Sequence, residues 1–519
     1  MNYKLLITTV LSIFFFSCQQ QQKATSSKDL TVKKPNIIFI YLDDLGFGDI
    51  SINGAKGFTT PNMDALAKGG VNFKNGYATS ATCTPSRYAA FTGQYPWRKN
   101  AKILPGTAPM LIDTTQVTLP KMLQSAGYET AIIGKWHLGL GSENKDWNQR
   151  IYPGPNDVGF DYSYILAATQ DRVPTVYIED GNVVNLDKND PIEVDYDQNF
   201  EGQPTGKDNP ELVTMMWHHG HNNTIVNGIP RIGYMKGGKS ALWSDVDMAD
   251  HFLGKVKSYI QTQSKTDKPF FLSYTMQQPH VPRTPHPRFV GLSGQGPRGD
   301  VILEADWCIG ELMKTLENEG ILENTLIILS SDNGPVLNDG YYDKAVELVG
   351  EHQPAGPLRG GKYSLFEAGA HVPFITYWKG KIEPSVSNAL VCQIDLFSSL
   401  AALVGSNIKG PDSKNILSSF LGQDKTGRSS LVLEATTRTS FRKGKWILIP
   451  SYKGKKRNEF VDIELGNNEE LMLFDLENDL SQTKNVAHQY PEVVEELLEE
   501  FYEIRGEWKK GVDNKLELK

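Results

Sequence analysis

Short runs of consecutive apolar residues recur along most of the chain. Residues 35–42 (PNIIFIYL) form the first run, and residues 129–133, 270–276, 325–329 and 372–378 form others. A run of this length that is apolar on both faces is typical of a strand buried within a parallel sheet. These segments therefore predict the strands of a central sheet.

Helical patterns lie between these runs. Residues 61–69 and 119–126 are predicted as short helices, and residues 244–261 and 301–319 have the apolar period of longer helices. Strands that alternate with helices indicate an α/β fold with a mostly parallel central sheet flanked by helices. We assign residues 35–410 to one such domain.

The pattern changes after residue 410. Residues 430–434, 445–449 and 470–475 are short predicted strands separated by turns, and residues 491–508 have the pattern of an acidic amphipathic helix. A smaller antiparallel sheet that carries one helix accounts for these elements. Residues 411–519 are therefore predicted to form a C-terminal α+β subdomain.

The N-terminus has the features of an export signal. Lys4 supplies positive charge and residues 5–16 form an apolar run, which is too short to span a bilayer. We interpret residues 1–17 as a signal peptide and the polar residues 18–34 as a flexible tether. Cys18 follows a small residue as in a bacterial lipobox, although the usual Leu three positions earlier is missing. We favour a lipid-anchored Cys18, at the periplasmic face or cell surface, over plain secretion.

The charge balance narrows the choice of partner. A formal net charge of −8 over 519 residues creates no field that would attract nucleic acid. The basic stretch at 453–457 is interpreted as a solvated hairpin turn rather than a binding patch. Positive charge for an anionic substrate must therefore gather locally, within a site, and membrane contact is expected only through the N-terminal lipid.

The chain has four cysteines, at positions 18, 83, 308 and 392. An exported location permits a disulfide between Cys308 and Cys392, and two separate buried thiols agree equally well with the sequence. No paired Cys or Cys/His spacing of a zinc site is present.

Acidic residues follow two of the predicted buried strands. Asp43 and Asp44 come directly after residues 35–42, and Asp332 and Asn333 follow residues 325–329. Ligands of α/β proteins bind at the carboxyl ends of strands, and carboxylate and amide oxygens suit Ca²⁺ or Mg²⁺. Each pair alone is also common in ordinary turns after a strand. Together they predict a divalent-metal site.

Basic and imidazole side chains follow other apolar runs. Lys135 and His137 come after residues 129–133, and an extended segment would project both to one side. His280 lies between two prolines, which predicts a rigid extended loop. Lys362 stands on a glycine-rich approach. Alone, a Lys-x-His pair is more often a surface lysine and a core histidine, and His280 is equally consistent with a structural role. The glycine-rich segment is also consistent with a flexible surface loop.

The segment Cys83-Thr84-Pro85-Ser86-Arg87, followed by Thr92-Gly93, matches the pattern C-x-P-S-R-x-x-x-x-T-G. The chain resembles the type I, formylglycine-dependent sulfatases, which are arylsulfatase-like members of the alkaline-phosphatase superfamily. Further similar blocks are NIIFIYLDD, GKWHLG, GFDY, PHVP, SDNG and LRGGKYSLFEAGA. The resemblance implies an alkaline-phosphatase-like fold with residues 35–410 as the sulfatase catalytic domain. Gln94 and His371 stand where the family often has arginine.

The resemblance also implies a mechanism. A formylglycine-generating or anaerobic sulfatase-maturating enzyme would oxidise Cys83 to an aldehyde, whose hydrate is the nucleophile and a metal ligand. Asp43, Asp44, Asp332 and Asn333 would complete the Ca²⁺ or Mg²⁺ site. The family pattern also implies that Arg87, Lys135 and Lys362 offset negative charge on the sulfuryl oxygens. His280 would be the general acid for the leaving alcohol, and His137 the base for sulfate release.

Substrate recognition is expected outside these blocks. Asp171 and Arg172 follow the GFDY block and can hydrogen-bond sugar hydroxyls, and His219 and His221 lie in a polar loop without a sequence-adjacent acid. We expect a sulfate monoester on a glycan, with galactose or N-acetylgalactosamine as the sugar. The alternatives are a phosphodiesterase or phosphonate hydrolase of the same superfamily, and an inactive glycan-binding relative.

Overall fold

The computed structural model describes residues 34–506. The predicted signal peptide, Cys18 and all of the tether except Lys34 lie outside the described residues. Within the described part of the chain, no helix is both long enough and apolar enough to cross a membrane.

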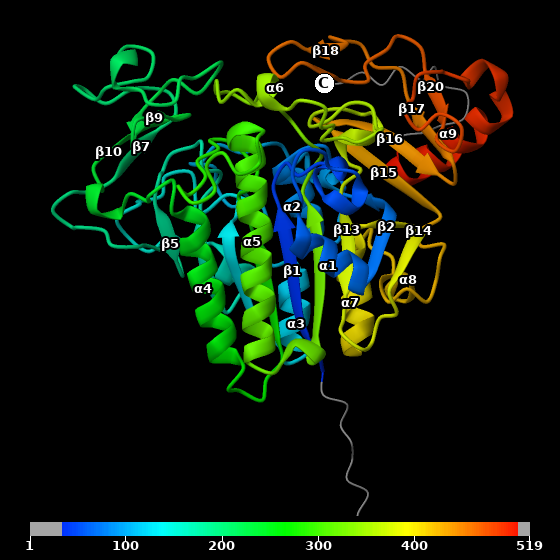
Figure 1. Cartoon of the computed structure of the whole chain (residues 1–519), viewed down its shortest axis with the longest axis horizontal. Helices are drawn as coiled ribbons and strands as arrows, with labels where there is room; N and C mark the ends of the chain where they lie inside the picture. Colours follow the sequence, from blue (N-terminus) through cyan, green and yellow to red (C-terminus); the bar gives the residue numbers. More distant parts are fainter. Residues whose placement is uncertain (1–33, 507–519) are drawn as a thin grey trace, which may run out of the picture. The chain divides into compact units, whose positions relative to one another are not determined.

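A ten-stranded sheet forms the centre of the molecule (Figure 1). Its strand order is β14-β2-β13-β12-β1-β11-β3-β4-β5-β6, and the neighbours from β12 through β1, β11 and β3 to β4 are all parallel. The mostly parallel sheet predicted from the apolar runs is confirmed. The strands are β1 Asn36–Leu42, β2 Val71–Tyr77, β3 Glu129–Lys135, β4 Tyr162–Leu166, β5 Tyr177–Glu179, β6 Asn182–Val183, β11 Phe270–Thr275, β12 Thr325–Ser331, β13 Phe374–Tyr377 and β14 Ser385–Cys392.

Burial on both faces explains why the residues of strand β1 are mostly apolar. Side chains alternate between the two faces of a strand, so Ile37 and Phe39 pack into one core layer while Ile38 and Ile40 pack into the other. Both faces of the sheet are covered, and every position of β1 is buried. Hydrophobic burial on both sides thus fixes β1 at the middle of the molecule.

Helices form the two covering layers. Helices α1, α4 and α5 pack on one face, where Figure 1 shows them in front of the sheet, and α2, α3 and α7 pack on the other. The helices are α1 Pro61–Gly69, α2 Cys83–Thr92, α3 Leu119–Ser125, α4 Met248–Gln263, α5 Gly296–Asn318, α6 Ala345–Leu348, α7 Leu396–Val404, α8 Leu417–Phe420 and α9 Pro491–Arg505.

A second sheet follows the main one in sequence. Its order is β15-β16-β17-β20, all antiparallel, and α9 packs on it, as predicted. In β15, the Glu434 amide donates to the Thr79 carbonyl at 3.1 Å and its carbonyl accepts from the Ala81 amide at 2.7 Å. The second sheet therefore supports the segment just before Cys83. Its strands are β15 Ser430–Ala435, β16 Arg438–Lys443, β17 Trp446–Ile449 and β20 Met472–Asp475.

Three two-stranded pairs complete the fold. They are β7 Glu193–Asp195 with β10 Tyr234–Lys236, β8 Ile225–Val226 with β9 Ile229–Pro230, and β18 Arg457–Asn458 with β19 Ile463–Glu464.

The structure decides one question that the sequence left open: Cys308 and Cys392 are separate buried thiols and form no disulfide. Several predicted element boundaries need correction. Helix α5 begins at Gly296, five residues before the predicted start, because Pro297 is well tolerated in a first helical turn. Helix α9 ends at Arg505, where Gly506 adopts the left-handed conformation that terminates helices. Strand β13 lies antiparallel to both its neighbours.

Candidate active site

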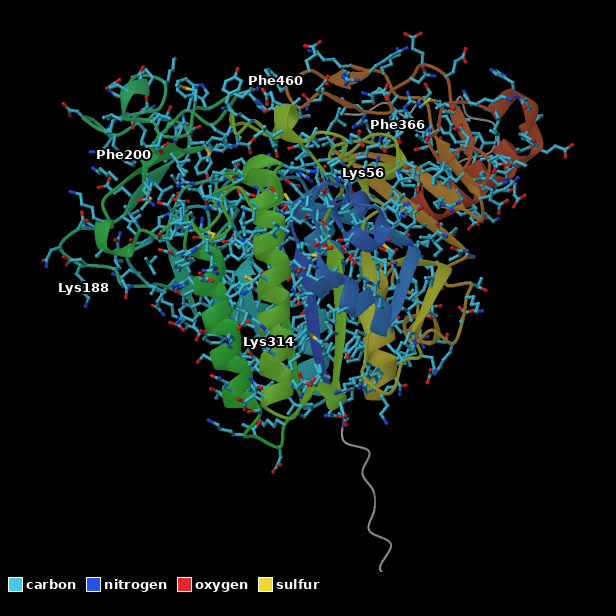
Figure 2. The ribbon with its side chains drawn as sticks, viewed as in Figure 1. Lys56, Lys188, Phe200, Lys314, Phe366 and Phe460 are labelled. Carbon is cyan, nitrogen blue, oxygen red and sulfur yellow. The ribbon has the colours of Figure 1, made fainter. Side chains whose placement is uncertain are left out.

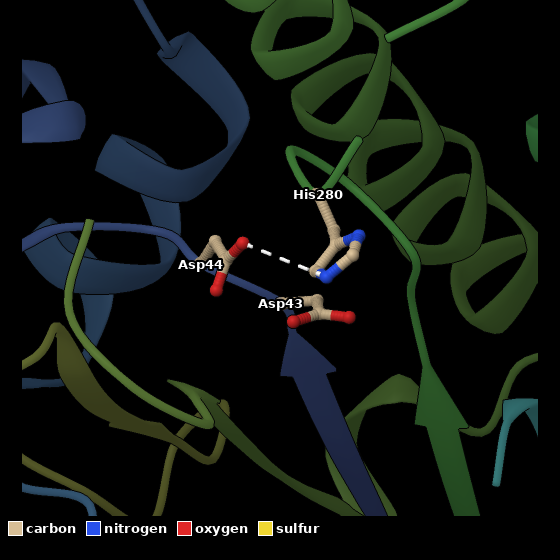
Figure 3. Close-up of side chains that lie close together, drawn as sticks. All are labelled: Asp43, Asp44 and His280. Atoms are coloured by element: carbon tan, nitrogen blue, oxygen red, sulfur yellow. Dashed lines mark ion pairs between the residues drawn. The ribbon is translucent and has the colours of Figure 1, made fainter. Parts of the chain in front are cut away.

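The candidate site lies at the carboxyl ends of four adjacent parallel strands. Asp43 and Asp44 follow β1, Asp332 follows β12, His280 follows β11, and Lys135 is the last residue of β3. Parallel neighbours end at the same edge of the sheet, so these residues converge although they are far apart in sequence. Figure 3 shows Asp43, Asp44 and His280 at the end of β1.

Asp44 contacts side chains from three other loops of the site. Its Oδ1 accepts from Asn333 Nδ2 at 2.7 Å, and its Oδ2 accepts from Lys362 Nζ at 2.9 Å. His280 Nε2 lies 3.9 Å from the same Oδ2, as the dashed line in Figure 3 marks. All four side chains are buried, so these contacts replace the water that the polar groups give up.

Two further ion pairs lie beside Asp44. Arg87 Nε donates to Asp332 Oδ2 at 2.9 Å, and Nη1 donates to the Lys135 carbonyl at 3.1 Å. Its Nη2 lies 2.8 Å from the same Asp332 oxygen as an ion-pair contact but makes no hydrogen bond. Lys135 Nζ donates to Asp43 Oδ2. All four side chains are completely buried, and each charge has an opposite partner.

Two oxygen atoms in the site have no hydrogen-bond partner. They are Asp43 Oδ1 and Asn333 Oδ1, both buried. Asp43, Asp44 and His280 also offer one ligand atom each within 4.8 Å of one another. Unpaired buried oxygens are costly alone and are the ligand type that Ca²⁺ and Mg²⁺ prefer. These residues therefore fit a hard divalent cation, with His280 as a neighbouring nitrogen donor that sequence reasoning did not include.

Cys83 begins helix α2 and faces His137. Its Sγ lies 3.3 Å from His137 Nδ1. Burial raises the pKa of the Cys83 thiol above its ordinary value, and nearby Lys135 only partly offsets this effect. Since the thiolate is the nucleophilic form, the unmodified thiol is a weak nucleophile here.

A hydrogen bond at Nε2 orients the ring of His137. Nε2 lies 2.9 Å from the Leu104 carbonyl, which can only accept, so Nε2 carries the proton and Nδ1 presents its lone pair to Cys83. Burial, reinforced by the charge of Lys135, holds the pKa of His137 well below its ordinary value. His137 has a φ of 57°, so the expectation of an extended Lys135–His137 segment is wrong. Both side chains nevertheless reach the site.

His280 lies in a turn rather than in the extended loop that its flanking prolines predicted. Its backbone amide donates to the Gln277 carbonyl at 3.0 Å. His280 Nδ1 donates to the Val281 carbonyl at 2.7 Å, which leaves Nε2 facing Asp44. The imidazole can therefore present a lone pair or a proton to the site through Nε2.

Lys362 has a second partner that sequence reasoning missed. Its Nζ donates to Asp339 Oδ2 at 2.8 Å as well as to Asp44. Burial alone would lower the pKa of Lys362, but Asp339 and Asp44 hold it well above its ordinary value. The signal available in the sequence was the turn Asn338-Asp339-Gly340, which begins four residues after the SDNG block ends.

The predicted sugar-binding residues divide into two groups. Asp171 accepts from Arg172 Nη1 at 3.0 Å, and its Oδ2 lies 2.7 Å from His221 Nε2, so the polar loop does bring an acid to a histidine. Burial opposes ionisation of Asp171, but Arg172 and His221 hold its pKa well below its ordinary value. The positive charge of Arg172 also helps to lower the pKa of His137. His219 does not join this group and stacks on Phe460 instead.

Comparison with known proteins agrees with this geometry. The sulfatase family model matches residues 35–406. An N-acetylgalactosamine-6-O-sulfatase of Bacteroides thetaiotaomicron is 50% identical over 484 residues, which cover 92% of this chain and 94% of that protein. Human arylsulfatase A is 30% identical over 411 residues, which cover 77% of this chain and 70% of the human protein.

A solved structure is also similar throughout. It comes from a study of the metabolism of multiple glycosaminoglycans by Bacteroides thetaiotaomicron, and it is 49% identical to this chain. The match covers 91% of this chain and 100% of that chain, with a TM-score of 0.90. The signature around Cys83, the fold and these relatives agree: the chain belongs to the sulfatase family of sulfuric ester hydrolases.

Proposed function

We propose that the protein is an exported carbohydrate sulfatase that removes the 6-O-sulfate of an N-acetylgalactosamine unit in a glycan. The observation that carries this proposal is the position of Cys83, which faces the unprotonated Nδ1 of His137 among buried cations. The choice of sugar and sulfate position is supported by the 50% identical bacterial relative, which is named as an N-acetylgalactosamine-6-O-sulfatase.

Cys83 acts in this account as formylglycine, made by a maturating enzyme. The hydrated aldehyde supplies one hydroxyl as the nucleophile. The second hydroxyl then gives up its proton, its oxygen re-forms the C=O bond and the C–O bond to sulfate breaks, an elimination that neither a thiol nor a serine can make. The raised pKa of the buried thiol supports this assignment, because it disfavours Cys83 as a nucleophile in its unmodified form.

A Ca²⁺ or Mg²⁺ ion would be held by Asp43, Asp44, Asn333 and the modified residue 83, with Asp332 beside them. Such an ion would acidify a bound hydroxyl and offset negative charge on the sulfuryl group. Dialysis against a chelator should abolish sulfate release, and adding Ca²⁺ or Mg²⁺ should restore it. Full activity of the metal-free protein would contradict the assignment.

The remaining residues handle charge and protons. Arg87, Lys135 and Lys362 surround the carboxylates and supply positive potential where sulfuryl oxygens develop charge. His280 Nε2 is oriented to give a proton to the leaving sugar hydroxyl. His137 Nδ1 is oriented to accept the proton when sulfate leaves.

The sugar would be recognised by Asp171, Arg172 and His221. A carboxylate held ionised between two donors is a strong, fixed acceptor for a sugar hydroxyl. Asp171→Asn should therefore raise the KM for the sulfated sugar while circular dichroism stays unchanged.

Defined saccharides test the whole proposal. Sulfate release should be fastest from N-acetylgalactosamine 6-sulfate, slower from galactose 6-sulfate and slowest from N-acetylgalactosamine 4-sulfate and glucosamine 6-sulfate. An aryl phosphodiester assayed beside them addresses the superfamily alternative, and faster phosphodiester turnover would overturn the proposal. No turnover of any ester, with Cys83 unmodified, would favour a glycan-binding relative.

A further inference from the structure

Four aromatic rings from three segments of the chain gather near the candidate active site. Phe460 lies between β18 and β19, and its ring stacks on His219 with centroids 5.0 Å apart. His218 contacts His219 through a 2.8 Å Nδ1–Nδ1 approach and packs edge-on against Tyr342 at 4.8 Å. We call Phe460, His219, His218 and Tyr342 the aromatic platform. Figure 2 labels Phe460 near the β18 hairpin.

The aromatic platform is connected to the active site at two points. Asn338 Nδ2 donates to the Phe460 carbonyl at 3.2 Å, and the next residue, Asp339, pairs with Lys362. The His219 carbonyl lies 2.8 Å from Nδ1 of His221, which contacts Asp171. The rings therefore lie next to the groups that would hold the sulfated sugar.

Two of the four rings are largely exposed, and the two histidines are half-buried, although the backbone of each segment is held in place. Phe460 is 61% exposed and Tyr342 is 59% exposed. The neighbouring Val461 and Ile463 pack against Val336 in a small apolar cluster, which anchors the hairpin that carries Phe460. Single exposed apolar residues are common, but a stacked pair fixed from two segments offers a preorganised surface.

Backbone hydrogen bonds hold the other two segments together. The His218 amide donates to the Gly340 carbonyl at 2.7 Å, and the Tyr342 amide donates to the Met216 carbonyl at 2.9 Å. His218 and Tyr342 therefore keep fixed positions relative to one another. Ordering costs on binding are reduced at such a surface.

The charge around the aromatic platform indicates the kind of ligand. Lys455 and Arg457 pair with Glu459 and Asp462. Lys453 and Lys456 lie in the same exposed loop, and no carboxylate among residues 34–506 lies within ion-pair distance of either. Both lysines precede Phe460 by only a few residues in the loop that leads into its hairpin. Free cations on the segment that carries an exposed ring suit an acidic saccharide, because one face of a pyranose consists of C–H groups that pack on an aromatic ring.

We propose that the aromatic platform binds the acidic sugar unit linked to the sulfated one, so that the protein acts on a glycan chain in preference to a free monosaccharide. This inference rests on the proposed function and adds a second saccharide subsite to it. The platform contributes ring stacking, and Lys453 and Lys456 contribute attraction to the carboxylate of that unit.

Two substrates that share one reacting unit test the subsite. One is N-acetylgalactosamine 6-sulfate, and the other is a tetrasaccharide that carries the same unit at its non-reducing end with a uronic acid next to it. Phe460→Ala should raise the KM for the tetrasaccharide about three- to tenfold, as expected for loss of an aromatic stacking contact. Its kcat, and both constants for the monosaccharide, should not change.

Matched variants separate stacking from general effects. Phe460→Tyr keeps the ring and should behave as wild type, and Val386→Ala removes an equally exposed side chain, 64% accessible, from the distant strand β14. Equal effects of Phe460→Ala on both substrates, or no effect on either, would overturn the subsite.

A binding measurement tests the subsite independently of the proposed catalytic function. Calorimetry of the tetrasaccharide with Cys83→Ala protein, with and without Phe460→Ala, should show the same three- to tenfold weakening. If the wild type releases sulfate from neither substrate, the proposed function fails, and calorimetry still decides the subsite. Unchanged affinity in the Phe460→Ala protein would reject it.

Discussion

Charge balance at the level of single residues explains why this site should need a metal ion. The buried carboxylates are those of Asp43, Asp44, Asp332 and Asp339, and the buried cations are Arg87, Lys135 and Lys362. Four negative groups against three positive groups would repel an anionic sulfate ester. A divalent cation reverses the sign of the site and also provides a partner for the two unpaired oxygens.

Arg87→Lys tests how strictly the site depends on guanidinium geometry. Arg87 donates two hydrogen bonds, to Asp332 and to the Lys135 carbonyl, from a planar guanidinium, and lysine reproduces the charge but not this geometry. We expect a loss of about 2–3 kcal/mol in the free energy of unfolding and a large fall in kcat, because Asp332 is left buried with fewer donors.

Urea unfolding and steady-state kinetics measure both effects of that change. Arg150→Lys, at an exposed position, serves as the control and should be neutral. A wild-type unfolding midpoint for Arg87→Lys would contradict this account of Asp332.

The sequence predicted several of these residues for a physical reason. Asp43 and Asp332 each follow a buried strand and Lys135 ends one, and parallel strands bring their ends to one edge. His280 was singled out by its two flanking prolines instead. Asp339 could not be found in this way, because it lies in a loop whose return to Lys362 depends on tertiary packing. The orientation of His137 likewise depends on the Leu104 carbonyl, 33 residues earlier.

At the level of elements, close backbone approach fixes the loop after β12. A Cβ at Gly334 would lie 1.6 Å from the Ala368 carbonyl oxygen, so glycine is the only residue that fits without movement. Gly334→Ala should shift Asp332 and Asn333, lower the melting temperature and reduce kcat at least tenfold.

Gly254→Ala is the matched control for Gly334→Ala. Gly254 lies in helix α4, and a Cβ there would meet nothing within 4 Å. Alanine favours the helix by up to about 1 kcal/mol, so this variant should be neutral or slightly stabilised. Equal behaviour of the two variants in a thermal melt would refute the packing argument.

Strand β15 carries a titratable group beneath the segment that precedes Cys83. Burial raises the pKa of Glu434 from its ordinary value of 4.5 to about 8. The folded protein therefore binds a proton that the unfolded chain releases between these values. Stability from this group is fully present below pH 4.5 and is lost as the pH rises through 8.

Glu434→Gln should remove that dependence. Glutamine is neutral at every pH, so the variant's melting temperature should fall less than that of the wild type between pH 5 and pH 8. Differential scanning calorimetry at the two pH values measures the difference. Parallel pH profiles for the two proteins would show that Glu434 does not titrate in this range.

The elements themselves were largely predictable from periodicity. Strands β1, β3, β11 and β12 are continuous apolar runs, and the structure confirms them. Helix α2 was not predicted, because its residues are buried all round and lack an amphipathic pattern. Strand β2 was also missed, since polar residues interrupt it.

At the scale of the whole molecule, the proposal of a lipid anchor depends on Cys18, which precedes the described residues. Cys18→Ala should move the protein from the membrane fraction to the soluble fraction without changing kcat, because all the candidate site residues lie within the described residues 34–506. Fractionation of cells that express each form measures the distribution. Retention of Cys18→Ala in the membrane fraction would exclude the lipid.

The most direct test of the central claim relates conversion of residue 83 to turnover. Preparations made with and without a sulfatase-maturating enzyme can be compared by mass spectrometry of the peptide that contains residue 83 and by sulfate release from N-acetylgalactosamine 6-sulfate. We predict that the rate is proportional to the aldehyde fraction and is zero for unmodified Cys83. Equal turnover by fully unmodified protein would contradict the account.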